Sequence, residues 1–181
     1  MRLFIAIELD SQVKRVLTDI QLNLKDSISK GNYTSSDNFH ITLRFIGEVN
    51  EDEAEKLKKA IDDTVQQIQP FTLYLGGLGH FPRKNKEIIW VGVKGQAEKL
   101  FKLKEQLETE LEVSGFSKEE QDYIPHITMV RQALLEKGFD EIKADLRVPE
   151  EKIAVKSLSL MESKRVEGDL VYTAIHKRDF H

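Results

Sequence analysis

The chain has 181 residues, of which 40% are hydrophobic and 32% charged, a composition ordinary for one soluble globular domain or two small lobes that share a core. It has no cysteine, which excludes disulfides, thiolate nucleophiles and cysteine-based zinc sites, and its net charge of −4 argues against broad, nonspecific adhesion to nucleic acid. The longest apolar run near the start, residues 3–7, is too short for a signal-peptide core or a membrane span, so we expect a cytoplasmic protein without membrane contact.

The chain opens with a strand pattern followed by a helix pattern. Residues 1–9 contain the apolar run and indicate a buried strand. Asp10 or Ser11 then offers an N-cap for a helix that we expect to end at Gly31. Its apolar positions recur every three or four residues: Val13, Leu17, Ile20, Leu24 and Ile28.

The next strand and helix follow in the same order. Residues 39–49 are rich in β-branched and aromatic side chains and predict a second strand. Asn50 and Glu53 have the spacing of a capping box, and Pro70 ends the helix that they begin. The apolar face of this helix comprises Ala54, Leu57, Ile61, Val65 and Ile68.

The middle of the chain predicts two strands and a helix. Residues 71–75 and 88–93 are the strands, separated by a glycine-rich and basic loop at residues 76–86. A third helix follows and is closed by Gly115. Its apolar positions are Leu100, Leu103, Leu107 and Leu111.

The last third predicts a strand and a closing hairpin. Residues 124–130 are the strand, and residues 132–150 are ambiguous, with a short helix inside a long connection as one interpretation. Residues 155–161 and 170–177 form the hairpin, with its turn at residues 167–169. The order of elements along the chain indicates an α+β fold with mostly antiparallel pairing.

One sequence segment occurs twice, about half a chain apart. Residues 39–43 read FHITL and residues 125–129 read PHITM, and both lie on predicted strands. We therefore expect residues 1–181 to form a single two-lobed, pseudo-symmetric domain in which the two copies face each other.

The repeated segment carries groups suited to a phosphoryl centre. Alternation along a strand puts His40 with Thr42, and His126 with Thr128, on one face. A neutral imidazole can accept a proton from attacking water, and a protonated one can donate to the leaving oxygen. The threonine hydroxyls can donate to phosphate oxygens. A lone strand histidine is more often structural than catalytic, but two matching copies favour catalysis without a metal.

The other histidines lack such a context. We expect His80 at the surface of the glycine-rich loop, although it could also line a cleft, and His176 and His181 exposed to solvent near the C-terminal end. The sequence contains neither a His-Glu-x-x-His segment nor a phosphate-binding glycine loop, so we predict no metal and no cofactor.

Three arginines are candidates for substrate binding. Arg44 shares the parity of His40 and can reach the cleft, while a solvated strand end is an equal alternative. Arg83 lies in a basic loop and is either a substrate contact or a solvated charge. Arg131 has the wrong parity to face inward with His126, and only a bulge or the end of the strand would turn it toward phosphate.

On these residues the chain resembles the two-histidine (2H) phosphoesterase superfamily and, within it, the RNA 2′,3′-cyclic phosphodiesterases, historically called 2′-5′ RNA ligases. The similarity extends over nearly the whole chain, and Met129 conservatively replaces the usual leucine. The matching segments are RLFIAI at 2–7, HITLRFIG at 40–47, FPR at 81–83, IWVGV at 89–93, PHITMVR at 125–131, and Tyr172.

The resemblance implies a bilobal fold with two antiparallel sheets lining a central cleft and helices outside. It implies metal-independent hydrolysis of a terminal 2′,3′-cyclic phosphate to a 2′-phosphate, with reversible 2′-5′ ligation as a companion activity. By motif position, His40 is the proton donor and His126 the proton acceptor. Thr42 and Thr128 hold the phosphate, and Arg131 corresponds to a frequent family arginine.

The expected substrates are RNA ends or nucleoside cyclic phosphates, and we expect a monomer. One alternative is a sibling phosphodiesterase that acts on another cyclic or 2′-5′ linked nucleotide, which depends on a pocket for base and sugar that loops would form. Another is an RNA-end binding module with low turnover. Loss of either histidine would have supported that module, and both are present.

Overall fold

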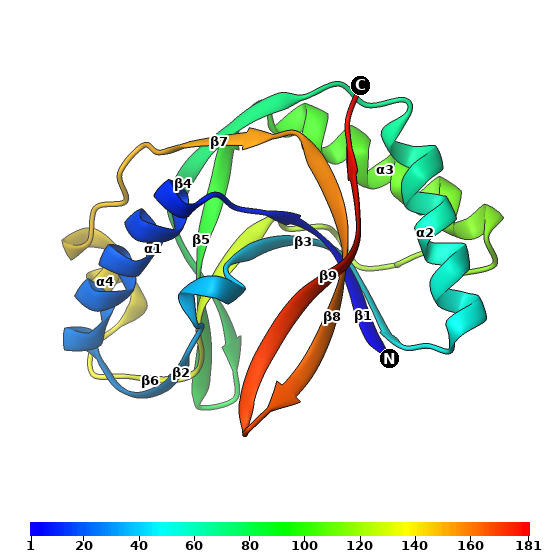
Figure 1. Ribbon diagram of the computed structural model, residues 1–181. Helices are drawn as coiled ribbons and strands as arrows, with labels where there is room; N and C mark the ends of the chain where they lie inside the picture. The colour runs from blue at the N-terminus through cyan, green and yellow to red at the C-terminus, as the bar shows by residue number, and fades with distance from the viewer.

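The computed structural model describes residues 1–181 and contains two antiparallel sheets with helices on their outer sides (Figure 1). The first sheet has four strands in the order β3-β1-β8-β9. Its strands are β1 (Arg2–Glu8), β3 (His40–Glu48), β8 (Ser157–Val166) and β9 (Asp169–Asp179). Helices α2 (Glu51–Val65) and α3 (Ala97–Val113) lie beside this sheet.

The second sheet has five strands in the order β2-β6-β5-β4-β7. They are β2 (Ile28–Tyr33), β4 (Phe71–Arg83), β5 (Lys86–Gly95), β6 (His126–Leu135) and β7 (Lys152–Val155). Its helices are α1 (Ser11–Leu24) and α4 (Phe139–Asp145), and short 3-10 turns occupy Lys25–Ser27 and Ser36–Asn38. The expected α+β class with two antiparallel sheets is confirmed.

The predicted helix starts are confirmed by their caps. The side chain of Asp10 accepts a hydrogen bond from the backbone N–H of Val13 at 2.9 Å, which satisfies one free donor of α1. Asn50 and Glu53 form the reciprocal capping box at the start of α2. Gly115, with φ of +94°, follows α3 in the left-handed conformation that a glycine adopts without strain.

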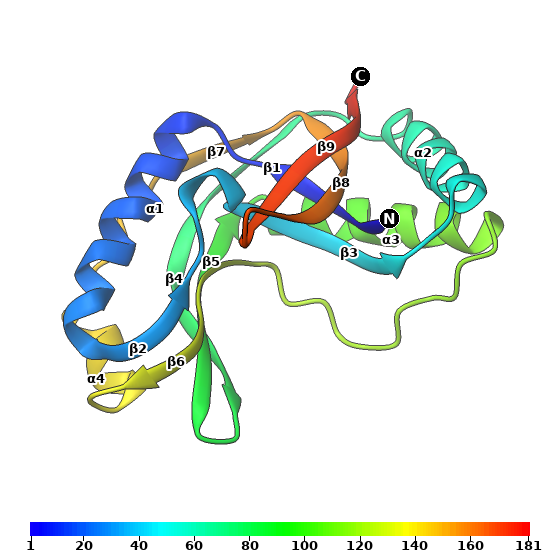
Figure 2. The ribbon, with the colours of Figure 1, turned by 60° about the horizontal axis from the view of Figure 1, so that its bottom comes forward.

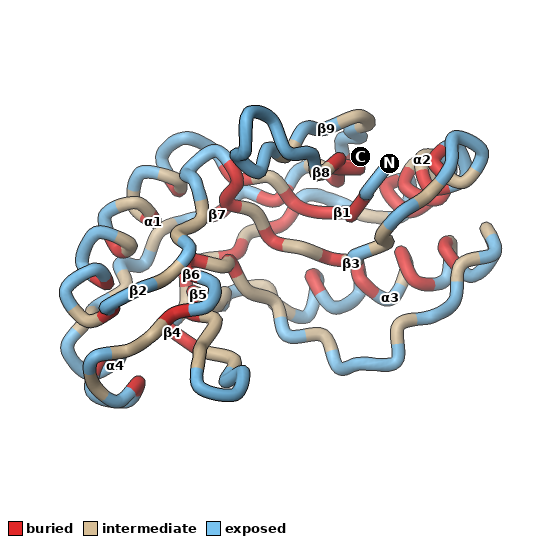
Figure 3. Tube along the Cα trace, turned by 90° about the horizontal axis from the view of Figure 1, so that it is seen from below, coloured by how far each residue is buried: buried red, intermediate tan, exposed pale blue.

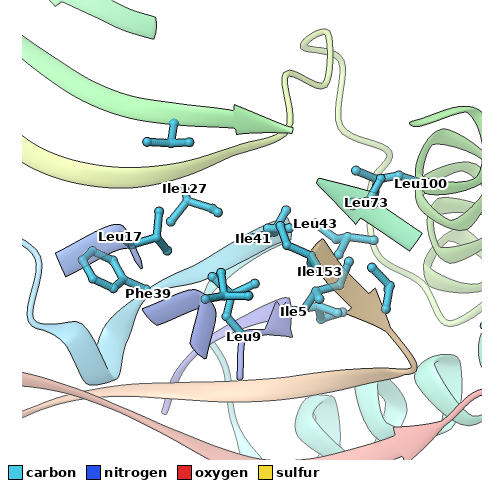
Figure 4. Packing of buried hydrophobic residues seen from close by; sticks show 14 of the residues in the cluster. Ile5, Leu9, Leu17, Phe39, Ile41, Leu43, Leu73, Leu100, Ile127 and Ile153 are labelled. Atoms are coloured by element: carbon cyan, nitrogen blue, oxygen red, sulfur yellow. The ribbon is translucent and has the colours of Figure 1, made fainter. Parts of the chain in front are cut away.

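One apolar core joins the two sheets. Its 38 buried residues come from strands of both sheets and from all four helices. Ile41 and Ile127, the middle residues of the two repeated segments, are fully buried and point into this shared interior (Figure 4). The helices are buried on the side that faces the sheets and exposed on the other (Figure 3). The strand alternation predicted for the repeats is therefore confirmed.

The expected end of the first helix at Gly31 is wrong. Helix α1 stops at Leu24, and Ile28 begins β2, a strand that the helical spacing of its apolar residues concealed. Gly31 lies inside β2, where a Cβ atom would sit 2.6 Å from Cγ1 of Val130 on the paired strand β6. The glycine permits this close approach of two strands and ends no helix.

The expected loop at residues 76–86 is instead a long hairpin. Strands β4 and β5 pair up to Arg83 and Lys86, with only a two-residue turn between them. Gly79 lies under the ring of Trp90, and a Cβ there would overlap that ring. The glycines that suggested a loop therefore serve cross-strand packing, which sequence composition does not distinguish from a turn.

The last third of the chain follows the prediction with longer strands. Strand β6 continues to Leu135, α4 supplies the short helix expected within residues 132–150, and β7 is an additional strand paired with β4. Strands β8 and β9 form the closing hairpin, with Glu167 and Gly168 at its turn. None of the helices has the length and apolar content needed to span a bilayer.

Candidate active site

The two His-x-Thr strands meet at one cavity between the sheets. Strands β3 and β6 pack against each other, although they belong to different sheets (Figure 2). His40, Thr42, His126 and Thr128 all line a cavity of about 770 Å³, which we call the central cavity. Its other lining residues are Arg2, Phe4, Phe45, Arg131, Ser163, Lys164, Arg165, Leu170 and Tyr172.

Backbone carbonyls set the tautomer of each histidine. Nδ1 of His40 donates to the carbonyl of Asn38 at 2.7 Å, and Nδ1 of His126 donates to the carbonyl of Ile124 at 2.7 Å. Because a carbonyl only accepts, Nδ1 carries the proton and Nε2 is the basic nitrogen of each neutral ring. Nε2 of His40 lies 2.8 Å from Oγ1 of Thr42, so the threonine hydroxyl can donate to it.

Burial favours the neutral form of both rings. It lowers the pKa of His40 to about 4; the bond to the carbonyl of Asn38 opposes this lowering, and the charges of Arg131 and His126 add to it. Burial also lowers the pKa of His126, and Arg131 acts in the same direction. At neutral pH the site therefore holds two neutral imidazoles beside a permanent positive charge, an arrangement that favours an incoming anion.

Aromatic rings surround each imidazole. The ring centroids of Phe4 and Tyr172 lie 4.9 and 5.3 Å from that of His40. Those of Phe81 and Trp90 lie 5.0 and 5.7 Å from that of His126. The two histidines thus have matching apolar surroundings, which restrict the rings and account for their desolvation.

A β-bulge turns Arg131 into the central cavity. Thr128 pairs with Trp90 and Val130 pairs with Ile89, so Met129 is the extra residue on β6. Met129 and Val130 are consecutive buried residues, and the alternation restarts with Arg131 on the face of His126 and Thr128. The condition that the sequence set for Arg131, a bulge after the motif, is met.

The equivalent bulge on β3 turns Arg44 away. Ala6 pairs with Thr42 and Ile5 pairs with Arg44, so Leu43 is the extra residue and Arg44 leaves the face of His40. Arg44 forms an ion pair of 2.5 Å with the buried Glu108. The structure does not bring Arg44 to the central cavity, and Phe45 lines it instead, because the bulge reverses the parity on which the expectation rested.

Arg83 lies outside the central cavity as well. It stands at the tip of the β4–β5 hairpin and lines a second cavity of about 1280 Å³, which Arg131 also lines. Because these residues form a hairpin and not the expected loop, Arg83 does not line the cavity that Thr42 and Thr128 line.

Several residues of the central cavity were not predicted from the sequence. Arg2 and Phe4 share one face of β1, and strand alternation offers a signal for them, since Phe4 packs beside His40. Arg2 lies over the ring of Phe45 at 5.0 Å, and Phe45 is 50% exposed. The residues contributed by the β8–β9 hairpin carry no local signal, because only tertiary packing brings that hairpin to the histidines.

The remaining histidines have structural partners. His80 pairs with Glu87 and stacks on Phe139, which ties the β4–β5 hairpin to α4. His176 was expected in solvent, but its side chain is only 15% exposed and bonds to Asp62 on α2 at 2.7 Å, because β9 packs against that helix. No three His, Asp or Glu side chains are grouped as a metal site requires.

Two sheets that each present a His-x-Thr pair to one cavity define the two-histidine phosphoesterase class. A family model described as the 2′-5′ RNA ligase superfamily matches residues 11–167, and the chain belongs to that superfamily.

Similar proteins extend over nearly the full length. A Thermotoga maritima protein named RNA 2′,3′-cyclic phosphodiesterase is 30% identical over 99% of this chain and 96% of its own. A Methanocaldococcus jannaschii protein of the same name is 31% identical over 97% of this chain and 98% of its own. The crystal structure of the Thermus thermophilus protein TT0787 superposes with a TM-score of 0.81 at 23% identity, covering 99% and 98% of the two chains.

Proposed function

We propose that this protein is an RNA 2′,3′-cyclic phosphodiesterase that converts cyclic phosphates on RNA ends or nucleosides to 2′-phosphates. The observation that carries the proposal is the convergence of His40, Thr42, His126 and Thr128 on one cavity, with Nδ1 of both rings engaged by a carbonyl. The names of the relatives from Thermotoga and Methanocaldococcus agree with it.

The reaction needs one acceptor and one donor of protons. Nε2 of neutral His126 accepts a proton from water while the water oxygen bonds to phosphorus. The bond from phosphorus to O3′ breaks in line with the attack, and Nε2–H of protonated His40 donates its proton to O3′. The phosphate stays on O2′, and the proton gained by His126 balances the one lost by His40.

The donor and acceptor roles follow the family resemblance, because the two motifs are nearly identical. Burial lowers the pKa of His40 to about 4 in the free protein, so His40 gains its proton when the anionic phosphate enters. Thr42, Thr128 and Arg131 donate to the non-bridging oxygens, where charge accumulates in the transition state.

Each lobe contributes one His-x-Thr pair to the site, so we propose that residues 1–181 act as one domain. One chain supplies both histidines, and we propose that a monomer is active. Since the imidazoles provide both base and acid, the reaction proceeds without a metal. With a 5′-hydroxyl in place of water, the same attack gives the 2′-5′ linkage for which the superfamily is named, and by microscopic reversibility the same residues cleave that linkage.

Substitution of the two histidines tests the proposal. His40→Ala and His126→Ala should each lower kcat by about 10²–10⁴, the usual contribution of a general acid or base. His181→Ala, at an exposed position away from the cavity, is the matched control and should retain full activity. Near-normal kcat in either site variant, with native circular dichroism, would contradict the two-histidine mechanism.

The product and the metal requirement are measured on the same enzyme. Phosphorus NMR of the product from a cyclic-phosphate-terminated RNA should show a 2′-phosphate, and excess chelator should leave the rate unchanged. A 3′-phosphate would contradict the assignment of His40 to O3′ and leave the acid–base pair standing. Activity lost with chelator and restored by a divalent ion would contradict the metal-free mechanism.

A further inference from the structure

A second cavity opens directly beside the central cavity. Its volume is about 1280 Å³, and it runs between the tips of two hairpins, one from each sheet. Arg83 and Lys86 line it from the β4–β5 hairpin, and Arg165 lines it from the β8–β9 hairpin. The two cavities share the lining residues Arg131, Arg165, Leu170 and Tyr172. They are therefore adjoining parts of one groove that begins at the histidines.

The cations of the second cavity are available to a ligand. Arg83, Lys86, Arg131 and Arg165 form no ion pair with a carboxylate, although the chain as a whole is acidic. Arg83 donates to the carbonyl of Pro82 at 2.9 Å and Arg165 to that of Gly168 at 3.0 Å, which anchors each guanidinium at its hairpin tip.

Three carboxylates also line the cavity, namely Asp37, Glu87 and Asp169, and Glu87 is engaged by His80. The remaining wall is a mixture of amides, hydroxyls and apolar surface, including Asn32, Ser35 and Val171. Separated cations among polar and apolar groups are typical of surfaces that follow a single nucleic-acid strand, where phosphates meet cations and bases pack on side chains.

We propose that the second cavity binds the RNA strand that leads to the cyclic phosphate, beginning with the nucleotide on the 5′ side of the terminal one. The inference rests on the proposed function. The central cavity already has the volume of a small-ligand site, so a nucleoside cyclic phosphate needs no more space. A chain that continues from the bound terminal nucleotide enters the adjoining cavity, where Arg83 and Lys86 meet its phosphates. The enzyme is thus built for oligonucleotide ends and accepts mononucleotides as truncated substrates.

The test compares substrates of different length. Initial rates are measured with a nucleoside 2′,3′-cyclic phosphate and with a di- and a trinucleotide that end in the same cyclic phosphate. We expect kcat/KM to rise by about tenfold or more from mononucleotide to trinucleotide, the factor contributed by one hydrogen bond between charged groups. The salt dependence should also steepen, because each phosphate contact changes the slope of log kcat/KM against log salt by about 0.7.

Lys86→Ala tests the contribution of the second cavity alone, because Lys86 does not line the central cavity. It should remove most of the trinucleotide advantage and about 0.7 of the salt slope, and leave kcat/KM for the mononucleotide unchanged. Lys84→Asn is the matched control, because Lys84 stands at the same turn, does not line the cavity, and has a φ of +57° that asparagine tolerates. The control should behave as wild type with all substrates.

The outcomes separate this inference from the proposed function. Hydrolysis of all three substrates with equal kcat/KM would overturn the proposal that the second cavity binds RNA, and would leave the proposed cyclic phosphodiesterase activity intact. A trinucleotide advantage that Lys86→Ala and Lys84→Asn reduce equally would also overturn it, since general charge and not the cavity would then be responsible. No hydrolysis of any substrate would overturn the proposed function itself.

Discussion

At the scale of single residues, one inserted position on each motif strand decides which side chains line the central cavity. Leu43 and Met129 are the extra residues of matching bulges, each located three places after the histidine of its motif. After each bulge the inward face is taken by the fifth residue after the histidine, Phe45 in one lobe and Arg131 in the other. The pseudo-symmetric backbone therefore presents an apolar group on one side and a cation on the other.

Arg131 should matter for turnover far more than its neighbours on the surface. We expect Arg131→Ala to lower kcat/KM by about 10²–10³, the range for removal of one preorganised donor to a charged transition state. Arg131→Lys should recover only part of the loss, since an ammonium lacks the fork of a guanidinium. The exposed and unpaired Arg147→Ala is the control, and an equal loss there would argue against a specific role.

The pH dependence of the rate follows from the two lowered pKa values. The profile of kcat/KM reports the free enzyme, in which the pKa of His40 is about 4 and that of His126 is also below its ordinary value of 6.5. One ring must be protonated and the other neutral, so kcat/KM should be bell-shaped with its maximum below pH 6.5.

The profile of kcat should reach its maximum at higher pH, because the bound anion raises both pKa values. Initial rates from pH 4 to 9 at low and saturating substrate measure both profiles. A flat profile, or a kcat/KM maximum above pH 6.5, would rule out this assignment of ionisation states.

At the scale of elements, helix side chains hold both bulges from behind. Lys104 on α3 donates to the carbonyl of Leu43 at 2.8 Å, and Gln21 on α1 donates to the carbonyl of Met129 at 3.0 Å. Each lobe thus satisfies the carbonyl of its extra residue with a long polar side chain from a covering helix. The bulges are specified by tertiary contacts, which agrees with their role in aiming Phe45 and Arg131.

A partly buried ionic network joins the two motif strands. Lys104 pairs with Glu108 at 2.6 Å and with Glu119 at 2.7 Å. Glu119 lies in the connection that leads from α3 to His126, and in the same connection Tyr123 donates to the carbonyl of Thr42 at 2.8 Å. The segment before one histidine is therefore anchored on the strand of the other.

Removal of the central lysine should destabilise the fold. Lys104→Met removes the cation that Glu108 and Glu119 share, but Glu108 keeps its ion pair with Arg44 and Glu119 is 33% exposed. We therefore expect the free energy of unfolding to fall by about 1–3 kcal/mol, the cost of the lost charged hydrogen bonds. Lys102→Met on the exposed side of α3 should change it by less than about 0.5 kcal/mol. Urea unfolding measures both, and similar values for the two variants would show that the network contributes no net stability.

The packing of the β4–β5 hairpin requires a glycine at position 79, because the ring of Trp90 occupies the space that a side chain would need. We expect Gly79→Ala to cost about 1–3 kcal/mol in unfolding free energy and to displace the ring of Trp90, because the new Cβ would overlap that ring. Trp90 is the only tryptophan, so its fluorescence reports the displacement. Gly138→Ala is the control, since its Cβ would meet nothing within 4 Å. An unchanged emission spectrum in Gly79→Ala would contradict the packing.

At the scale of the whole molecule, the candidate active site lies between two sheets that share one core. Unfolding separates the two sheets, exposes His40 to water and restores its ordinary pKa. The folding equilibrium and the protonation state of His40 are therefore linked. Because the pKa of His40 is depressed in the folded protein, its contribution to stability is complete above pH 6.5. That contribution is lost as the pH falls toward 4.

Acid unfolding measures this linkage. Between pH 7 and pH 4 we expect His40 to remove about 3 kcal/mol of unfolding free energy. The His40→Gln variant lacks this ionisation. Between pH 7 and pH 4 its unfolding free energy should therefore fall by about 3 kcal/mol less than that of the wild type. Asp62 and Glu108 also have lowered pKa values, but they lose their contribution equally in both proteins. Identical pH dependence in the two proteins would contradict the burial of His40.

The sequence by itself determined the elements whose causes are local. Alternation around Ile41 and Ile127 identified the motif strands and the inward histidines, and the capping residues Asp10 and Asn50 located two helix starts. These signals are readable because neighbouring residues create them. The same local reading assigned Gly31 to a helix end and residues 76–86 to a loop, since a glycine that admits a neighbouring strand looks like one that ends an element.

Only the tertiary structure decided what depends on contacts between distant segments. The bulges at Leu43 and Met129 arise from pairing with β1 and β5, and they sent Arg44 out of the cavity and Arg131 into it. The groove beyond the histidines is formed by hairpin tips from different sheets. A side chain's parity along a strand is a local property, but the register that can reverse it belongs to the strand beside it.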